Sequence, residues 1–265
     1  MLDIRGITKR FFPGTVNERV ALDELSLALG EGDFVTIIGS NGAGKSTLLN
    51  CISGRYQLDG GSIHIAGRDV TKMSEYRRAR YVARVFQDPM AGTAPHMTIE
   101  ENLAIAFARG QRRGLPMAVT NRKRAQYREA LERLDLGLEN RLAMRVGMLS
   151  GGQRQALSLL MAAHERPDIL LLDEHTAALD PSRAELITRL TKEMVEEHGL
   201  TALMVTHNMQ QAIDLGNRLI MMHEGHIVLE VDEERKRQVT PEQLAQTFAE
   251  VKGAQLSDRT LLGDS

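Results

Sequence analysis

The sequence has 265 residues, enough for one large domain or two lobes packed together, and its 42% hydrophobic and 26% charged residues are ordinary. A formal net charge of −2 argues against nucleic-acid binding by the whole molecule, and the single cysteine, Cys51, excludes an internal disulfide. No window offers the roughly 20 apolar residues that span a bilayer, and the start Met1–Arg5 lacks the features of a signal peptide. We therefore expect a cytoplasmic chain that needs another polypeptide for any membrane process.

The first third of the chain predicts strands and turns. Residues Val20–Leu29 alternate apolar and polar side chains, and Gly30–Asp33 has the composition of a turn. Phe34–Ile38 is a β-branched run typical of a strand buried in a parallel sheet. It leads into a loop with three glycines and then into a helix predicted from Lys45 to about Ser53. Strand, glycine loop and helix form the context that a phosphate-binding loop requires.

The glycine loop matches the pattern G-x-x-x-x-G-K-S/T, in which successive backbone N–H groups surround phosphates at a helix N-terminus. Lys45 is predicted to reach the β- and γ-phosphates, and the Ser46 hydroxyl is predicted to ligate Mg²⁺. The residues predicted to bind the nucleotide here are Gly39, Ser40, Asn41, Gly42, Ala43, Gly44, Lys45, Ser46 and Thr47.

From about Gly92 to Ala163 the pattern is helical. Two sets of apolar residues each share a helical face, namely Leu103, Ala106 and Phe107, and Leu131, Leu134 and Leu138. The segment is also rich in cations, which indicates either a solvated helix face or a surface near anionic lipid headgroups. These cations are Arg109, Arg112, Arg113, Arg122, Lys123, Arg124, Arg128 and Arg133.

After Pro167 the pattern predicts βαβ units and a parallel sheet, with strands at Ile169–Leu172, Ala202–Val205 and Leu219–Met222. A last helix is predicted to begin at Thr240, because an N-cap, an N1 proline and an N3 glutamine follow in order.

The strand at Ile169–Leu172 delivers two carboxylates to its C-terminal end, where open α/β sheets bind ligands. Asp173 is predicted to hold Mg²⁺ through its water shell. Glu174 is predicted to orient or deprotonate the attacking water.

A third motif, Leu149-Ser150-Gly151-Gly152-Gln153, opens a helical run, and its glycines offer anion-binding N–H groups. With this signature between the two nucleotide motifs, the sequence resembles the ATP-binding-cassette (ABC) ATPases from about Leu2 to Val231. The resemblance implies an α/β fold with a P-loop NTPase (RecA-like) core and an N-terminal antiparallel β subdomain. It further implies an ATPase domain at 1–230 with a helical subdomain inserted at about 92–163, and a helical tail at 231–265.

The resemblance also assigns roles to residues outside these motifs. Gln87 is similar to the Q-loop glutamine that contacts Mg²⁺ and the water, and Asp180 lies in a segment similar to the D-loop. His207 is similar to the switch histidine beside the γ-phosphate. The catalytic set is thus Glu174, His207 and Gln87, and the metal set is Ser46, Gln87 and Asp173.

Two positions leave alternatives open. Phe11 is similar to the aromatic residue that stacks on adenine, but the adjacent Phe12 leaves the register open. His175 stands where many family members have proline, and it either packs, meets solvent, or tunes the neighbouring Glu174.

The cofactors that the resemblance implies are ATP and Mg²⁺, and the partner that it implies first is a second copy. In a head-to-tail dimer, the P-loop of one copy and Ser150, Gly151, Gly152 and Gln153 of the other would sandwich each ATP. Further implied partners are transmembrane permease subunits, at the cytoplasmic side of the cell membrane, and an extracytoplasmic substrate-binding protein. No nucleic acid is expected.

A free-standing cassette is typical of bacterial importers, and residues 13–18 and 88–95 resemble an importer subgroup loosely linked to amino-acid uptake, including tryptophan and tyrosine. The alternative is a soluble ABC ATPase of non-transport type, such as one for iron–sulfur cluster assembly. In a transporter, the loop Asp88–Thr98 and the helices beginning near Ile99 would form a groove for a helix of the membrane partner, with Met90, Ala91 and Met97 as candidate contacts.

Overall fold

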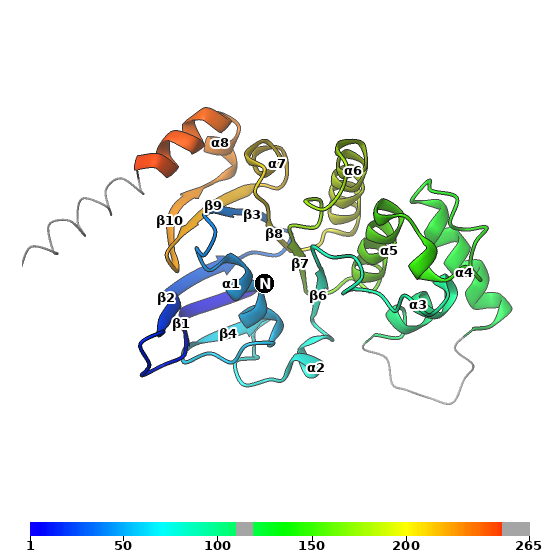
Figure 1. Ribbon diagram of the computed structural model, residues 1–265, viewed down its shortest axis with the longest axis horizontal. Coiled ribbons are helices and arrows are strands. Elements are labelled where there is room, and N and C mark those ends of the chain that lie inside the picture. The colour runs from blue at the N-terminus through cyan, green and yellow to red at the C-terminus, as the bar shows by residue number, and fades with distance from the viewer. Residues whose placement is uncertain (110–118, 251–265) are drawn as a thin grey trace, which may run out of the picture.

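A computed structural model describes residues 1–109 and 119–250 of the chain (Figure 1). In this part of the chain the strands form a four-stranded sheet in the order β2-β1-β4-β5 and a six-stranded sheet in the order β10-β9-β3-β8-β7-β6. The strands of the first sheet are β1 (Leu2–Phe11), β2 (Arg19–Leu29), β4 (Gly60–Ile65) and β5 (Arg68–Asp69). Those of the second are β3 (Phe34–Gly39), β6 (Val82–Val85), β7 (Ile169–Asp173), β8 (Ala202–Val205), β9 (Arg218–His223) and β10 (His226–Val231).

The helices separate into two groups. The first part of the chain contains α1 (Lys45–Ser53), α2 (Glu75–Arg78), α3 (Ile99–Ala106), α4 (Asn121–Glu132), the 3₁₀ turn η1 (Val146–Met148) and α5 (Gly151–Ala163). The later helices are α6 (Pro181–His198), α7 (Met209–Asp214) and α8 (Glu233–Lys236). Figure 1 shows α3, α4 and α5 gathered at one end of the long axis and β1, β2 and β4 toward the other.

The six-stranded sheet has parallel pairing from β9 through β3, β8 and β7 to β6, and β10 joins its edge antiparallel. The β3, β7 and β8 runs predicted from the sequence are buried almost throughout, as strands covered on both faces require. Because parallel strands all end at one edge, Gly39, Asp173 and Thr206 come together there. The α/β fold with a P-loop core is confirmed.

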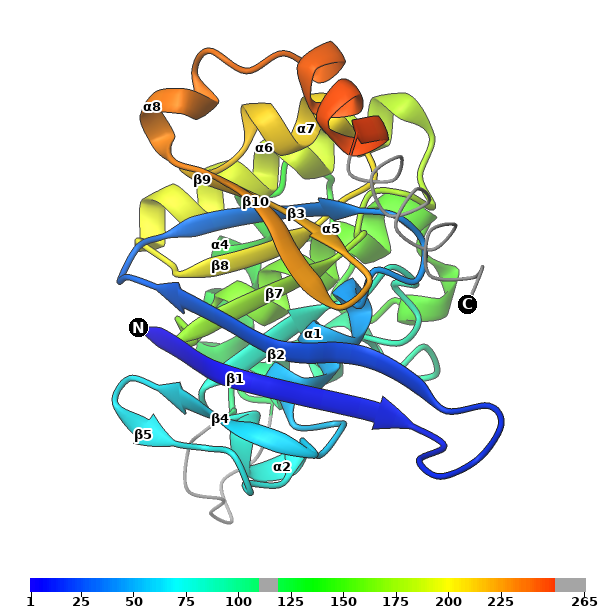
Figure 2. The ribbon, with the colours of Figure 1, turned by 90° about the vertical axis from the view of Figure 1, so that its left-hand side faces the viewer.

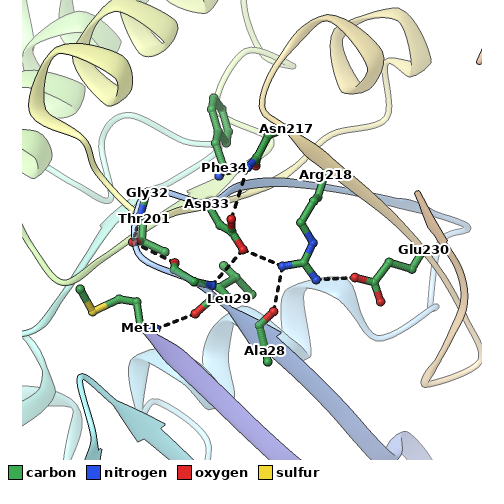
Figure 3. Close-up of polar contacts among 11 residues, drawn as sticks. Met1, Ala28, Leu29, Gly32, Asp33, Phe34, Thr201, Asn217, Arg218 and Glu230 are labelled. Atoms are coloured by element: carbon green, nitrogen blue, oxygen red, sulfur yellow. Dashed lines mark hydrogen bonds and ion pairs between the residues drawn. The ribbon is translucent and has the colours of Figure 1, made fainter. Parts of the chain in front are cut away.

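The opposite edge of this sheet is fixed by a polar cluster around Asp33 (Figure 3). The Nη1 of Arg218 lies 2.6 Å from Oδ2 of Asp33 and also donates to the carbonyl of Ala28. The backbone N–H of Phe34 donates to Oδ1 of Asn217. These bonds tie the first residues of β3 and β9 to the end of β2.

The antiparallel sheet lies beside the parallel one with α1 between them (Figure 2). Leu48, Leu49 and Ile52 of α1 are fully buried in a core shared by both sheets. Cys51 belongs to the same core, and burial raises the pKa of its thiol to about 12. The cysteine is therefore an inert packing residue.

Helices α3, α4, α5 and α6 pack against one face of the parallel sheet in a second core, and α4 is shorter than its apolar pattern predicts. Helix α4 ends at Glu132, yet Leu134 and Leu138 remain fully buried in the core with Leu131. Asp135 and Gly137 have φ of 53° and 67°, so the chain turns between the two leucines. The shared apolar face is real, but turns supply part of it.

Several cations of the basic segment have partners within the fold. The Nη2 of Arg109 donates to the carbonyls of Met161 and Ala162 at the end of α5. Arg124 forms a bidentate pair with Glu100, and Arg133 pairs with Glu197. These pairs do not decide between a solvated helix face and a surface near lipid, which stay predictions, and Arg112 and Arg113 lie outside the described residues.

The predicted last helix begins where the sequence indicates. Residues 241–250 are helical, and the Thr240 hydroxyl and the Gln243 side chain exchange capping bonds with each other's backbone N–H. Leu244 is buried beside Val231. The rest of the tail predicted at 231–265, from residue 251 on, lies outside the described residues. Among the residues that the structure describes, none of the helices has the length and apolar character needed to cross a bilayer.

Candidate active site

The predicted phosphate loop joins β3 to α1 in a conformation that requires glycine. Gly39 and Gly44 have φ of 154° and 99°. A Cβ on Gly39 would lie 2.2 Å from the carbonyl oxygen of Met222, and one on Gly44 would lie 2.4 Å from that of Ala21. Both positions therefore exclude any side chain, and the loop can expose its backbone N–H groups at the start of α1.

Lys45 is buried at the first position of α1. Its ammonium donates to the carbonyls of Gly39 (2.8 Å) and Ser40 (3.0 Å). Burial lowers its pKa, an effect that the carboxylates of Glu174 and Asp173 partly offset. A buried ammonium held inside the glycine loop beside two acids is placed to bind phosphate oxygens. The next residue, Ser46, is exposed.

Glu174 and His207 come together at the ends of neighbouring strands. Glu174 follows β7 with φ of 46°, and its backbone N–H donates to the carbonyl of Val205 at the end of β8. This turn brings Oε1 of Glu174 to 2.5 Å from Nε2 of His207. The side chain of Glu174 is 13% exposed and that of His207 is 45% exposed, so the histidine lies on the outer side of the acid.

The segment that carries His207 is fastened to α6 by a chain of hydrogen bonds. The Thr206 hydroxyl donates to Oε1 of Gln211 at 2.6 Å. The side-chain amide of Gln211 donates in turn to the hydroxyl of Thr188 at 2.8 Å. The backbone that carries His207 is thus held by residues on both sides of it, and its side chain is partly exposed.

Asp173 has a partner that the sequence patterns did not reveal. The Nη2 of Arg84, on β6, lies 2.5 Å from Oδ2 of Asp173, and Nη1 of the same guanidinium donates to Oδ1 of Asn50 at 2.6 Å. The signal that could have found Arg84 is a cation within the otherwise apolar run Val82–Val85, since a buried charge needs a partner.

The oxygen atoms of this edge suit a magnesium ion. Mg²⁺ is bound through one or two protein oxygens together with water and substrate phosphates, and it prefers hard oxygen ligands. Asp173 supplies a carboxylate, and Ser46 supplies a hydroxyl at the start of α1. The donor set therefore fits Mg²⁺, and Asp173 and Ser46 would hold it.

The signature motif forms a capped helix start packed on the D-loop segment. The Ser150 hydroxyl accepts from the backbone N–H of Gln153, and the Gln153 side chain accepts from that of Ser150. A Cβ on Gly152 would meet the side chain of Arg183 at 2.9 Å, and one on Gly151 would lie near Leu179. Asp180, the N-cap of α6, is thus beside the signature.

Three other predicted positions are less closely joined to this centre. The ring of Phe11 packs edge-on against Tyr56 at 5.4 Å, while the adjacent Phe12 is 68% exposed. Gln87 is exposed just after β6, and Thr47 is half-buried in α1. The roles assigned to these three residues, like those of the other predicted site residues, stay predictions.

His175 packs in the protein interior, which is one of the alternatives left open by the sequence. It is buried, and its Nε2 lies 2.8 Å from the hydroxyl of Thr191 on α6. That hydroxyl donates to the carbonyl of Ile187, so Nε2 carries the proton and donates to Thr191. Burial lowers the pKa of His175 to about 4, which keeps the ring neutral.

A glycine loop around a buried lysine after β3, with an acid pair at the end of β7, the next strand but one in the same sheet, defines the P-loop nucleotide hydrolases. Residues 22–177 match the family model described as ABC transporter, and the chain belongs to this family. It is therefore an ABC-type ATPase, as the sequence predicts.

The curated relatives agree with this assignment. The chain is 44% identical over 249 residues to the tyrosine transport ATP-binding protein of Clostridioides difficile strain R20291, covering 94% of this chain and 98% of the relative. It is 39% identical to the aliphatic sulfonates import ATP-binding protein SsuB 2 of Agrobacterium fabrum, covering 89% and 81%.

Solved structures agree as well. The dimeric post-hydrolysis state of the ATP-binding cassette MJ0796 bound to ADP and Pi superposes with a TM-score of 0.75 at 28% identity, covering 88% of this chain and 99% of that chain. The ADP conformation of MJ1267, an ATP-binding cassette of an ABC transporter, gives a TM-score of 0.75 at 27% identity, covering 92% and 97%.

Proposed function

We propose that the chain is the ATPase subunit of a bacterial import system, using Mg²⁺ and working as a head-to-tail dimer at the cytoplasmic side of the membrane. The observation that carries the proposal is the 2.5 Å contact between Glu174 and His207, next to Lys45 and Asp173 at the carboxyl edge of the parallel sheet. A general base and a second polar group lie together at the place where a polyphosphate would bind.

The geometry supports a separate role in ATP hydrolysis for each residue of the site. Lys45 and the N–H groups of the glycine loop bind the phosphates, and the carboxylate of Glu174 orients the attacking water and accepts its proton. His207 holds Oε1 of Glu174 through Nε2 and can turn toward the terminal phosphate, because its side chain is partly exposed. When bound, Mg²⁺ neutralises charge on the phosphate oxygens. Gln87 stays a proposed contact of the ion and the water.

The signature motif supports the dimer. Ser150 caps α5 while the N–H groups of Gly151 and Gly152 form a second anion-binding helix start. Because Lys45 already serves the near side of the phosphates, a second copy is the simplest source of this second anion-binding group. Asp180, next to the signature, would then lie near the partner's nucleotide.

A groove between α2 and α3 supports a membrane partner. It has a volume of about 1190 Å³ and is lined by residues that include Tyr76, Tyr81, Met97, Ile105 and Met161. Tyr76 and Ile105 are 75% and 59% exposed, so the groove presents apolar surface to a helix from a permease. The sequence predicts this groove between Asp88–Thr98 and the helices from Ile99, and from that loop Gly92 and Met97 line it. Met90 and Ala91, the other two predicted contacts, do not line it and are exposed on the loop.

The relatives support the direction of transport and a substrate class. The similarity to a tyrosine transport protein across nearly the whole chain makes tyrosine the first candidate, delivered by an extracytoplasmic binding protein. It also makes a non-transport ATPase, such as one for iron–sulfur cluster assembly, the less favoured alternative.

Uptake of labelled tyrosine by cells that depend on this chain tests the proposal. Cells with the native chain should accumulate tyrosine, and cells with Glu174→Gln should not. When either chain is tagged and purified, the permease should co-purify with it. Purified chain that hydrolyses ATP but never retains a polytopic membrane protein would favour the non-transport alternative. Uptake of another solute by the intact system would change the proposed substrate and leave the proposed import function standing.

A further inference from the structure

The guanidinium of Arg84 joins two elements of the ATPase site. Its Nη2 binds Oδ2 of Asp173 at the end of β7, and its Nη1 binds Oδ1 of Asn50 on α1. Asn50 lies four residues after Ser46, and residues four apart share one face of a helix. Arg84 therefore connects the carboxylate of the metal site to the helix that carries its hydroxyl.

The side chain of Arg84 is held in one position. It is 10% exposed, and its guanidinium lies over the ring of Phe86 at 4.8 Å from the ring centroid. An arginine offers a rigid planar fork of donors, so one side chain can bind two acceptors at fixed angles, which a lysine cannot do. The ion pair uses Oδ2 of Asp173, which leaves Oδ1 as the oxygen for the water shell of an ion.

We infer that Arg84 is a positioning residue for magnesium. It sets the separation between the carboxylate of Asp173 and the hydroxyl of Ser46 by holding β7 against α1, and it orients the carboxylate. This inference rests on the proposed site for Mg²⁺ and ATP, and it assigns Arg84 no contact with the nucleotide. Hydrogen-bonded partners that orient metal ligands are worth about 10- to 100-fold in metal affinity or activity.

The test measures how nucleotide binding depends on free Mg²⁺. The purified full chain binds a non-hydrolysable ATP analogue, once in EDTA and once across a series of Mg²⁺ concentrations. In Arg84→Met, the Mg²⁺ concentration that gives half of the Mg²⁺-dependent change in nucleotide binding should rise about tenfold. Binding in EDTA should stay within about twofold of the native value, because Arg84 does not touch the nucleotide.

Three further variants separate positioning from folding. Arg84→Lys keeps the charge and should recover part of the loss. Asn50→Ala removes one anchor of the guanidinium and should shift the Mg²⁺ dependence in the same direction, by less. Arg218→Met is the matched control, because it breaks the partly buried ion pair with Asp33 at the opposite end of the strands (Figure 3). This variant should lower stability and leave the Mg²⁺ dependence of nucleotide binding unchanged.

The outcomes distinguish this inference from the proposed function. An unchanged Mg²⁺ dependence in Arg84→Met would overturn the inference and leave the ATPase site intact. A lower Mg²⁺ requirement would also overturn it, because Arg84 would then compete with the ion for Asp173. A native chain whose nucleotide binding ignores Mg²⁺ altogether would contradict the proposed function itself.

Discussion

Nε2 of His207 lies 2.5 Å from Oε1 of Glu174, although the two residues belong to different strand ends, after β8 and β7. The contact depends on the turn at Glu174, whose backbone N–H bonds to Val205, and on the Thr206–Gln211 bond that fastens the following segment. The acid is thus positioned by the backbone and the histidine by its neighbours.

Glu174→Gln should abolish catalysis while sparing binding. The amide keeps the shape of the side chain but cannot accept a proton, so ATP hydrolysis should fall about 100-fold or more, the scale of a positioned general base. ATP should still bind, because Lys45 and the glycine loop are unchanged, and ATP-bound dimers should accumulate in size-exclusion chromatography. Turnover close to that of the native chain would remove Glu174 from the role of base.

Ser150→Arg tests whether the signature acts on the partner's nucleotide. A bulky cation at the start of α5 should block closure of the dimer, so hydrolysis should be lost while ATP binding by the single chain stays within a few-fold of normal. Lys45→Ala should instead lose binding. Mixed dimers of the two variants should regain at most one active site. If Ser150→Arg weakened binding as much as Lys45→Ala does, the signature would belong to the pocket of its own chain.

Patterns that are local in the sequence predicted much of this fold. The run Phe34–Ile38, the glycines after it and the helix from Lys45 are consecutive, and each has a strong local preference. The helix after Thr240 was equally readable, because its cap residues are neighbours. The apolar strand that ends at Asp173 gave the position of the acids.

What local patterns could not predict are contacts between distant residues. Arg84 and Asp173 are 89 residues apart and meet only because β6 and β7 pair in the sheet. The positions of Leu134 and Leu138 suggested a longer helix, whereas positive φ at Asp135 and Gly137 turns the chain. Periodicity reports which residues are buried, and the backbone path that buries them is settled by the tertiary packing.

Ile105→Glu should separate transport from hydrolysis. Ile105 is 59% exposed in the groove between α2 and α3, so a carboxylate there should prevent an apolar helix of the permease from docking. ATP hydrolysis by the isolated chain should stay within a few-fold of normal, and the permease should no longer co-purify. The matched control is Val16→Glu, at a fully exposed apolar residue in the loop between β1 and β2, which should keep the permease bound. Retention of the permease by Ile105→Glu would place the docking surface elsewhere.

The buried His175 predicts a loss of stability at low pH. In the unfolded chain a histidine binds a proton below about pH 6.5, but in the folded protein burial lowers the pKa of His175 to about 4. Above pH 6.5 the ring is therefore neutral in both states, and its protonation does not affect the free energy of unfolding. As the pH falls from 6.5 toward 4, the free energy of unfolding decreases by about 1.4 kcal/mol per pH unit, because the unfolded state binds the proton.

His175→Leu should flatten this dependence. Urea unfolding at pH 7.5 and pH 5 gives the difference in the free energy of unfolding, and that difference should shrink by about 2 kcal/mol in the variant. His164, whose pKa burial also lowers to about 4, should preserve part of the native dependence. A pH difference unaltered by His175→Leu would mean that the ring gains its proton in the folded state without cost.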